Sequence, residues 1–172
     1  LHRDVDYVSF CHPNLNPDNA WFWRDERGQL QAGLLDWGGA GQMSIAQALS
    51  GMLMMVEPER HLAMVRTVLE TFIAGYAADG GPQIDFEELH LQYKASLFST
   101  ALGLIVGMIV DLLPQFSEEE YRSMETRFDR RLLDNGLYAA IVWIDDMLRE
   151  WQDDMTPGDA CRRIVERMEA IA

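Results

Sequence analysis

The hydrophobic pattern of this chain changes near residue 43, and the change limits the folds open to it. Before that point, three short segments rich in aromatic and β-prone residues are separated by polar turns. After it, apolar residues recur with a spacing close to 3.6, as at Leu62, Val65, Leu69 and Phe72. We therefore predict an α+β chain that is mainly α. A small β element occupies residues 1–42, and a helical bundle occupies residues 43–172 of the same domain.

The predicted strands are Tyr7–Phe10, Ala20–Trp23 and Leu30–Leu35, and a polar turn joins the last two as a hairpin. Asp85, with Glu88 three residues later, has the pattern of a capping box. Helices are expected over 43–56, 59–78 and 85–113, after Ser117, over 137–151, and from Thr156–Pro157 onward.

The net charge of the chain limits the classes of partner that it is expected to bind. The chain has 28 acidic and 14 basic residues, a net charge of -14. This balance argues against unassisted binding to nucleic acid or to an anionic membrane. It favours a cationic substrate or partner, although an acidic surface also simply keeps proteins soluble. The longest apolar run, Ala101–Leu113, is too short to span a bilayer and contains Asp111, so we expect a buried core helix there.

The two cysteines, Cys11 and Cys161, have no motif spacing. They are expected to be free thiols in a reducing compartment, which predicts a cytoplasmic protein. The chain starts at Leu1, without a methionine or a signal peptide, and we expect it to be a fragment of a longer protein.

The segments "FCHPNLNPDNAWFW" and "GLLDWGGAG" are the most informative part of the sequence. A polar loop with His12, Asn14 and Asn19 lies between two predicted strands, and the hairpin then leads to Asp36. Asn19 and Asp36 should therefore lie at one end of the hairpin. Amide and carboxylate oxygens suit a hard cation such as Mg²⁺. The alternative is that Asn, Asp, Gly and Pro are present only because turns need them.

The spacing favours the metal and phosphate interpretation. Kinase-like folds use a loop of the form H-x-D-x-x-x-x-N, followed about twenty residues later by a metal-binding Asp. Asp36 comes 22 residues after Asn14. The stretch resembles the "HGDLHPDN … DW" signature of aminoglycoside phosphotransferases, choline kinases and their relatives. The matching letters are His12, Leu15, Pro17, Asp18, Asn19, Asp36 and Trp37.

The resemblance implies the C-terminal lobe of a protein-kinase-like fold and an ATP-dependent phosphotransferase. Asn19 and Asp36 would hold Mg²⁺ that bridges the ATP phosphates. His12 would be a structural member of the catalytic loop, and Asn14 would stand at the catalytic-base position. The acceptor would be a small molecule with a hydroxyl group, and the net charge favours a cationic one. A partner lobe with a phosphate-binding lysine would also be needed, because Lys94, the only lysine, falls in a predicted helix.

Two acids of the family pattern are amides here. Asn14 has no carboxylate to accept a proton, and loss of a general base typically lowers the rate ~10²–10⁴-fold. Gln47 stands near a position where the family has a second, bracing Asp. Asp18 is a substitute base only if it points toward the substrate. The fragment alone is predicted to be inactive.

Three functions follow from these observations. The first is the large lobe of a phosphotransferase. The second is an inactive pseudokinase that binds nucleotide or protein partners. The third is a helical interaction domain without a nucleotide site.

Two further groups have alternative explanations. Arg162, Arg163 and Arg167 fit a solvated helix face better than a phosphate site. The tryptophans at 21, 23 and 37 either line a pocket or pack on the hairpin.

Overall fold

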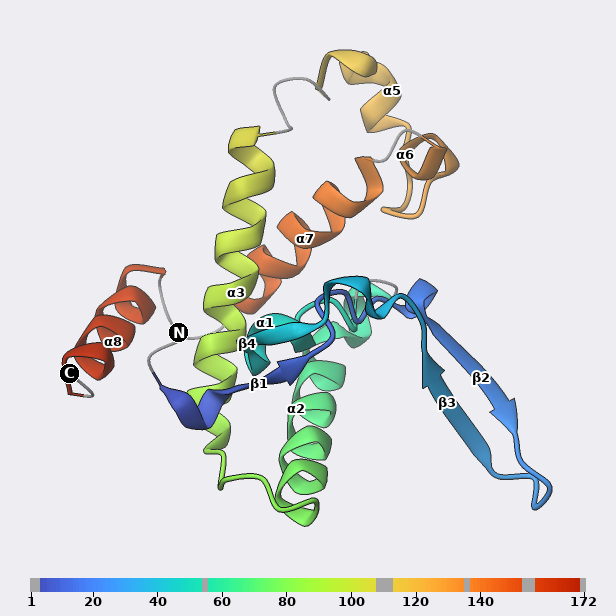
Figure 1. Cartoon of the computed structure of the whole chain (residues 1–172). Coiled ribbons are helices and arrows are strands. Elements are labelled where there is room, and N and C mark those ends of the chain that lie inside the picture. The colour runs from blue at the N-terminus through green and yellow to red at the C-terminus, as the bar shows by residue number, and fades with distance from the viewer. Residues whose placement is uncertain (1–3, 54–55, 108–112, 135–136, 153–156, 171–172) are drawn as a thin grey trace.

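The chain is mainly helical, with two small antiparallel sheets, as the coarse α+β prediction expected (Figure 1). The long helix α3 (Phe86–Gly107) is central and contacts α1 (Ile45–Leu49), α2 (His61–Ala78), α7 (Leu137–Glu150) and α8 (Pro157–Ala170). The computed structural model describes residues 4–53, 56–107, 113–134, 137–152 and 157–170.

The three predicted strands are present, with ends shifted by one residue. β2 (Ala20–Arg24) and β3 (Leu30–Leu34) form the hairpin, in which Ala20 pairs with Leu34. β1 (Val8–Cys11) pairs with an unpredicted strand, β4 (Gly41–Ser44). β4 was missed because its Gly-Gln-Met-Ser sequence has little β propensity and its partner is distant along the chain. Because β4 extends to Ser44, the first helix begins at Ile45 and not at the predicted residue 43.

The other elements are short. They are the 3₁₀ helices η1 (Val5–Tyr7), η2 (Pro17–Asn19), η3 (Trp37–Gly39), η4 (Pro58–Arg60) and η5 (Leu113–Gln115), and the helices α5 (Glu118–Arg122) and α6 (Arg130–Asp134).

Both predicted helix caps are present. The Asp85 Oδ1 atom accepts the Glu88 N–H at 2.9 Å, and the Ser117 side chain forms a complete capping box with Glu120. The Asp85 N–H donates to the Tyr7 hydroxyl at 3.2 Å and so ties the start of α3 to the β element. The helix predicted over 43–56 was too long, because α1 ends at Leu49, and the helix expected after Ser117 is the short α5, which ends at Arg122. Asp111 and Thr156, named in the sequence analysis, lie outside the described residues.

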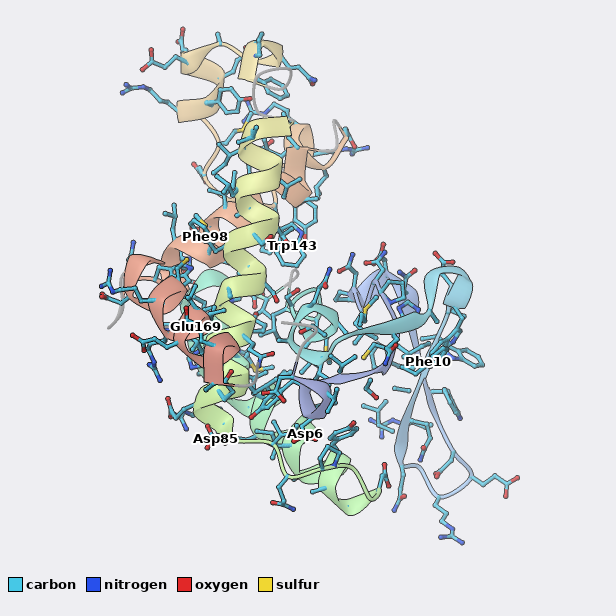
Figure 2. All side chains as sticks on the ribbon, turned by 60° about the vertical axis from the view of Figure 1, so that its left-hand side comes forward. Asp6, Phe10, Asp85, Phe98, Trp143 and Glu169 are labelled. Carbon is cyan, nitrogen blue, oxygen red and sulfur yellow. The ribbon has the colours of Figure 1, made fainter. Side chains whose placement is uncertain are left out.

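The core lies where α1, α2, α3 and α7 meet, and it includes the buried side chains of Ile45, Leu69, Leu89 and Leu97. Phe98 on α3 and Trp143 on α7 pack against this core (Figure 2). None of the helices found in the described residues is long and apolar enough to cross a membrane.

The upper end of α3 differs from the prediction of a fully buried helix. Ala101 is buried, but Leu102 and Val106 are exposed because α3 extends beyond the helices that cover its middle (Figure 1).

Candidate functional site

His12 connects the loop after β1 to the end of the hairpin. Its side chain is buried. The Asn14 N–H donates to His12 Nδ1 at 3.1 Å, so Nδ1 is the acceptor and Nε2 carries the proton. His12 Nε2 then donates to the Leu35 carbonyl oxygen at 2.6 Å. Both ring nitrogens are therefore occupied by backbone contacts, and the imidazole positions the loop.

The hairpin brings Asn19 and Asp36 to the same end. Asn19 directly precedes β2, and Asp36 follows β3 by two residues. The Leu35 N–H donates to the Asn19 carbonyl oxygen at 2.8 Å, which extends the ladder by one step. Asn19 Nδ2 donates to the Asn14 carbonyl oxygen at 3.0 Å. This bond fixes the amide group and leaves Oδ1 available as an oxygen ligand.

Asp36 has an unusual backbone conformation. Its φ of 55° and ψ of 58° lie in the left-handed region, and it is the only described non-glycine residue with positive φ. Such strain is found at functional sites more often than elsewhere. The Asp36 side chain is exposed and makes no hydrogen bond or ion pair with another described residue. The conformation is thus maintained by the surrounding backbone and leaves the carboxylate unpaired.

Close packing holds the two loops together. The ring of Trp37 meets the His12 ring edge to face, with centroids 5.0 Å apart, and Trp37 Nε1 donates to the Leu34 carbonyl oxygen. A Cβ atom on Gly39 would lie 3.0 Å from Pro13 Cγ, so this glycine allows the segment after Asp36 to approach the loop after β1.

The other predicted residues have less defined positions. Asn14 and Asp18 are both exposed. Gln47 is exposed on α1, and no described residue receives a bracing hydrogen bond from its side chain. Asn16 instead reaches the turn after α1, where a Cβ atom on Gly51 would lie only 2.5 Å from Asn16 Oδ1. The sequence analysis did not single out Asn16 for this contact.

Asn19 and Asp36 offer one amide oxygen and one carboxylate, which are suitable ligands for Mg²⁺. Among the described residues there is no group of three or more His, Cys, Asp or Glu side chains that could hold a metal ion alone. Mg²⁺ commonly binds through one or two protein ligands together with phosphate oxygens and water. The donor set therefore fits Mg²⁺ carried by a phosphate compound better than a tightly bound structural metal.

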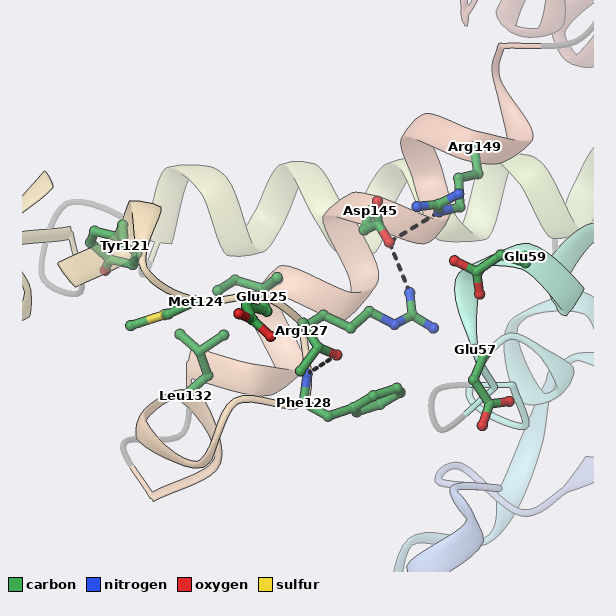
Figure 3. Close-up of a pocket in the computed structure, with 12 residues that line it drawn as sticks. Glu57, Glu59, Tyr121, Met124, Glu125, Arg127, Phe128, Leu132, Asp145 and Arg149 are labelled. Atoms are coloured by element: carbon green, nitrogen blue, oxygen red, sulfur yellow. Dashed lines mark hydrogen bonds and ion pairs between the residues drawn. The ribbon is translucent and has the colours of Figure 1, made fainter. Parts of the chain in front are cut away.

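A pocket of about 640 Å³ lies between η4, the segment that joins α5 to α6, and α7 (Figure 3). Asp145 is paired with Arg127 and Arg149, each at 3.0 Å. The pocket lining also includes the carboxylates of Glu57, Glu59 and Glu125 and the rings of Tyr121 and Phe128.

These three glutamates have no ion-pair partner in the described part of the chain. Unpaired carboxylates beside aromatic rings favour an organic cation.

Tyr138 lies beside the pocket wall. The Phe128 and Tyr138 rings have centroids 5.9 Å apart. Burial raises the pKa of Tyr138, and the charges of Asp146 and Asp18 raise it further, against the opposing effect of Arg127.

Sequence analysis missed a buried charged cluster behind the pocket. His61, Arg127, Asp146 and Glu150 are all buried. His61 lies beside both Asp146 and Glu150, and Arg127 pairs with Asp146. The available signal was the pair of acids four residues apart on α7, because i and i+4 side chains share one helix face.

Comparison with known proteins found no similarity: no protein-family model, curated protein or solved structure matches the chain.

Proposed function

We propose that the chain is the large lobe of an ATP-dependent small-molecule phosphotransferase that resembles aminoglycoside phosphotransferases and choline kinases. The supporting observation is the arrangement of Asn19 and Asp36 at one end of the hairpin, with His12 holding the adjoining loop. The unpaired Asp36 carboxylate in a strained conformation adds to this support.

In this proposal, Asn19 and Asp36 hold Mg²⁺, which supplies electrostatic stabilisation of the ATP phosphates when bound. His12 contributes by fixing the loop, since both of its nitrogens are already engaged. Asn14 orients the acceptor hydroxyl through its amide but does not accept the proton. A partner lobe supplies the lysine and covers the phosphates.

The acidic pocket is the proposed acceptor site. Its unpaired glutamates would attract an amine, and its aromatic rings would contact the attached carbon skeleton. The acceptor class is therefore a hydroxyl compound that carries positive charge.

A catalytically inactive pseudokinase is the second candidate, and Asn14 is the specific observation that favours it. The test is phosphate transfer from radiolabelled ATP, measured in the full-length polypeptide for the wild type and for Asn14→Asp. A rate that rises about 10²–10⁴-fold in the variant supports the proposed phosphotransferase site. It also shows that Asn14 makes the wild type inactive or slow. If neither protein transferred phosphate to a cationic acceptor and neither bound MgATP, the proposed phosphotransferase function would be refuted.

A further inference from the structure

The two walls of the acidic pocket rest on different hydrophobic clusters. One wall carries Glu57 and Glu59 and adjoins Val56, which packs against the main core. The opposite wall carries Tyr121 and Met124, which pack in a separate, smaller cluster with residues of α6 and α7. Apolar packing within each cluster therefore does not by itself set the distance between the two walls.

Arg127, in the loop between α5 and α6, joins these parts of the chain. Its side chain is only 5% exposed. Arg127 Nη1 donates to Asp145 Oδ2 at 3.0 Å and to Asp146 Oδ1 at 2.6 Å, both on α7. Arg127 Nη2 donates to the Val56 carbonyl oxygen. Figure 3 shows the side chain extending from its loop toward Asp145. One guanidinium group thus connects the loop, α7 and the segment that carries the first wall.

The loop that presents Arg127 is held by its own contacts. The Phe128 N–H donates to Thr126 Oγ1 at 3.3 Å, and the Asp129 N–H donates to the Thr126 carbonyl oxygen at 3.1 Å. The guanidinium carbon of Arg127 lies 5.4 Å from the centroid of the Phe128 ring. The backbone on both sides of Arg127 is therefore fixed, and Phe128 covers the side chain where it leaves the loop.

The chemistry of this connection requires an arginine. The two Nη groups of a guanidinium point in different directions from one rigid plane, whereas a lysine has a single ammonium group on a flexible stem. A lysine at this position would keep the charge beside Asp145 and Asp146 but would lose the rigid connection to Val56. The charge of Arg127 has the same sign as the proposed ligand, so Arg127 can favour binding of a cation only through the positions of other groups.

We propose that Arg127 is the positioning residue of this pocket. It holds the wall with Glu57 and Glu59 at a fixed distance from the wall with Tyr121 and Phe128, so that carboxylates and rings contact one organic cation together. This inference rests on the proposed cation site, but it does not depend on phosphate transfer.

The test is an NMR titration of tetraethylammonium chloride, at constant ionic strength, into the full-length polypeptide. Arg127→Lys leaves the net charge unchanged and should weaken binding at least about ten-fold. Arg131→Lys is the matched control, because the contacts of Arg131 with Asp129 and Ser123 stay within the segment 123–131. Its affinity should stay within about two-fold of the wild type. Circular dichroism establishes that each variant is folded at the temperature of the titration.

Amide hydrogen exchange provides a second measurement that needs no ligand. In the first wall, the Val56 N–H donates to the Leu53 carbonyl oxygen and the Arg60 N–H donates to the Glu57 carbonyl oxygen, each at 3.0 Å. Exchange of these two amides should be at least about five-fold faster in Arg127→Lys than in the wild type, and unchanged in Arg131→Lys.

The two measurements separate this inference from the proposed function. A wild type that does not bind tetraethylammonium would contradict the proposed acceptor site, while faster exchange in Arg127→Lys would still support the positioning role. A merely structural arginine would lower the Tm of Arg127→Lys without changing the cation affinity or the local exchange of the folded protein. That result would overturn the proposal, as would an equal loss of affinity in Arg131→Lys.

Nitrogen-15 NMR of the wild-type arginine side chains does not require a variant to fold. Nη1 and Nη2 of Arg127 should give separate signals, because their hydrogen bonds to Asp146 and Val56 prevent rotation of the guanidinium group. A single averaged signal for the two nitrogens would refute the proposed connection.

Discussion

Replacing Asp36 by glycine should leave the stability of the fold unchanged or raise it slightly. A left-handed conformation costs an L-residue about 1–2 kcal/mol, and Asp lies at the lower end of that range because its short polar side chain tolerates the region. Glycine removes this strain but adds about 0.5–1 kcal/mol of backbone entropy to the unfolded state. The Asp36 side chain has no described partner whose contact would be lost. The net expectation for Asp36→Gly is a gain of about 0–0.5 kcal/mol, or at most about 2 °C in Tm.

Two further variants separate strain from charge. Asp36→Asn keeps a side chain that tolerates the left-handed region and removes only the charge, so its stability should stay within about 0.5 kcal/mol of the wild type. Asp36→Ala removes the carboxylate but retains the strain, and it should be the least stable of the three. Urea denaturation followed by circular dichroism measures all of these differences. If Asp36→Gly were less stable than the wild type by more than about 0.5 kcal/mol, the carboxylate would have a structural role and the argument would fail.

Three other changes test separate parts of the structure. Glu150→Gln should destabilise the fold by about 3 kcal/mol at neutral pH, because contacts with His61 and His90 outweigh burial and lower the pKa of Glu150 from 4.5 to about 2. The stability that the ionised Glu150 contributes is complete above pH 4.5 and is lost as pH falls toward 2. The urea midpoints of the variant and the wild type should therefore converge at low pH. A difference between the midpoints that does not change with pH would contradict this expectation. Gly33→Ala should displace the Trp21 indole, since a Cβ atom there would lie 1.8 Å from its Nε1 atom; unchanged far-ultraviolet exciton coupling between Trp21 and Trp23 would count against it. His12→Phe should cost about 1–3 kcal/mol in urea denaturation by leaving the Leu35 carbonyl without its donor, and a neutral result would show that water replaces the ring.

Short sequence patterns predicted the elements that are determined by interactions between residues close together in the chain. The caps at Asp85 and Ser117 were found because the capping pattern spans only four residues: a side-chain oxygen accepts one of the free N–H groups of the first helical turn. The hairpin was found because two aromatic or apolar runs flank a polar turn. In the structure the Asp25 carboxylate accepts the backbone N–H groups of Arg27 and Gln29, each at 2.9 Å, and so fixes that turn.

Features that depend on distant contacts were not predictable in the same way. β4 exists because β1 offers it a hydrogen-bonding edge, and its own four residues carry no strand signal. The His61, Asp146 and Glu150 cluster depends on the packing of α2 against α7, which periodicity does not specify. The exposed state of Gln47 and the contact of Asn16 at Gly51 likewise follow from how α1 packs against the loop.

We propose that Asn19 and Asp36 form a site for Mg²⁺ and nucleotide. The most direct measurement is a calorimetric titration of MgATP into the full-length polypeptide, beside Asp36→Ala and with Glu26→Ala as a control for the loss of one exposed acid elsewhere on the hairpin. We expect Mg²⁺-dependent binding that is lost in Asp36→Ala and kept in Glu26→Ala. Absence of binding in the wild type, or equal binding in all three proteins, would contradict it.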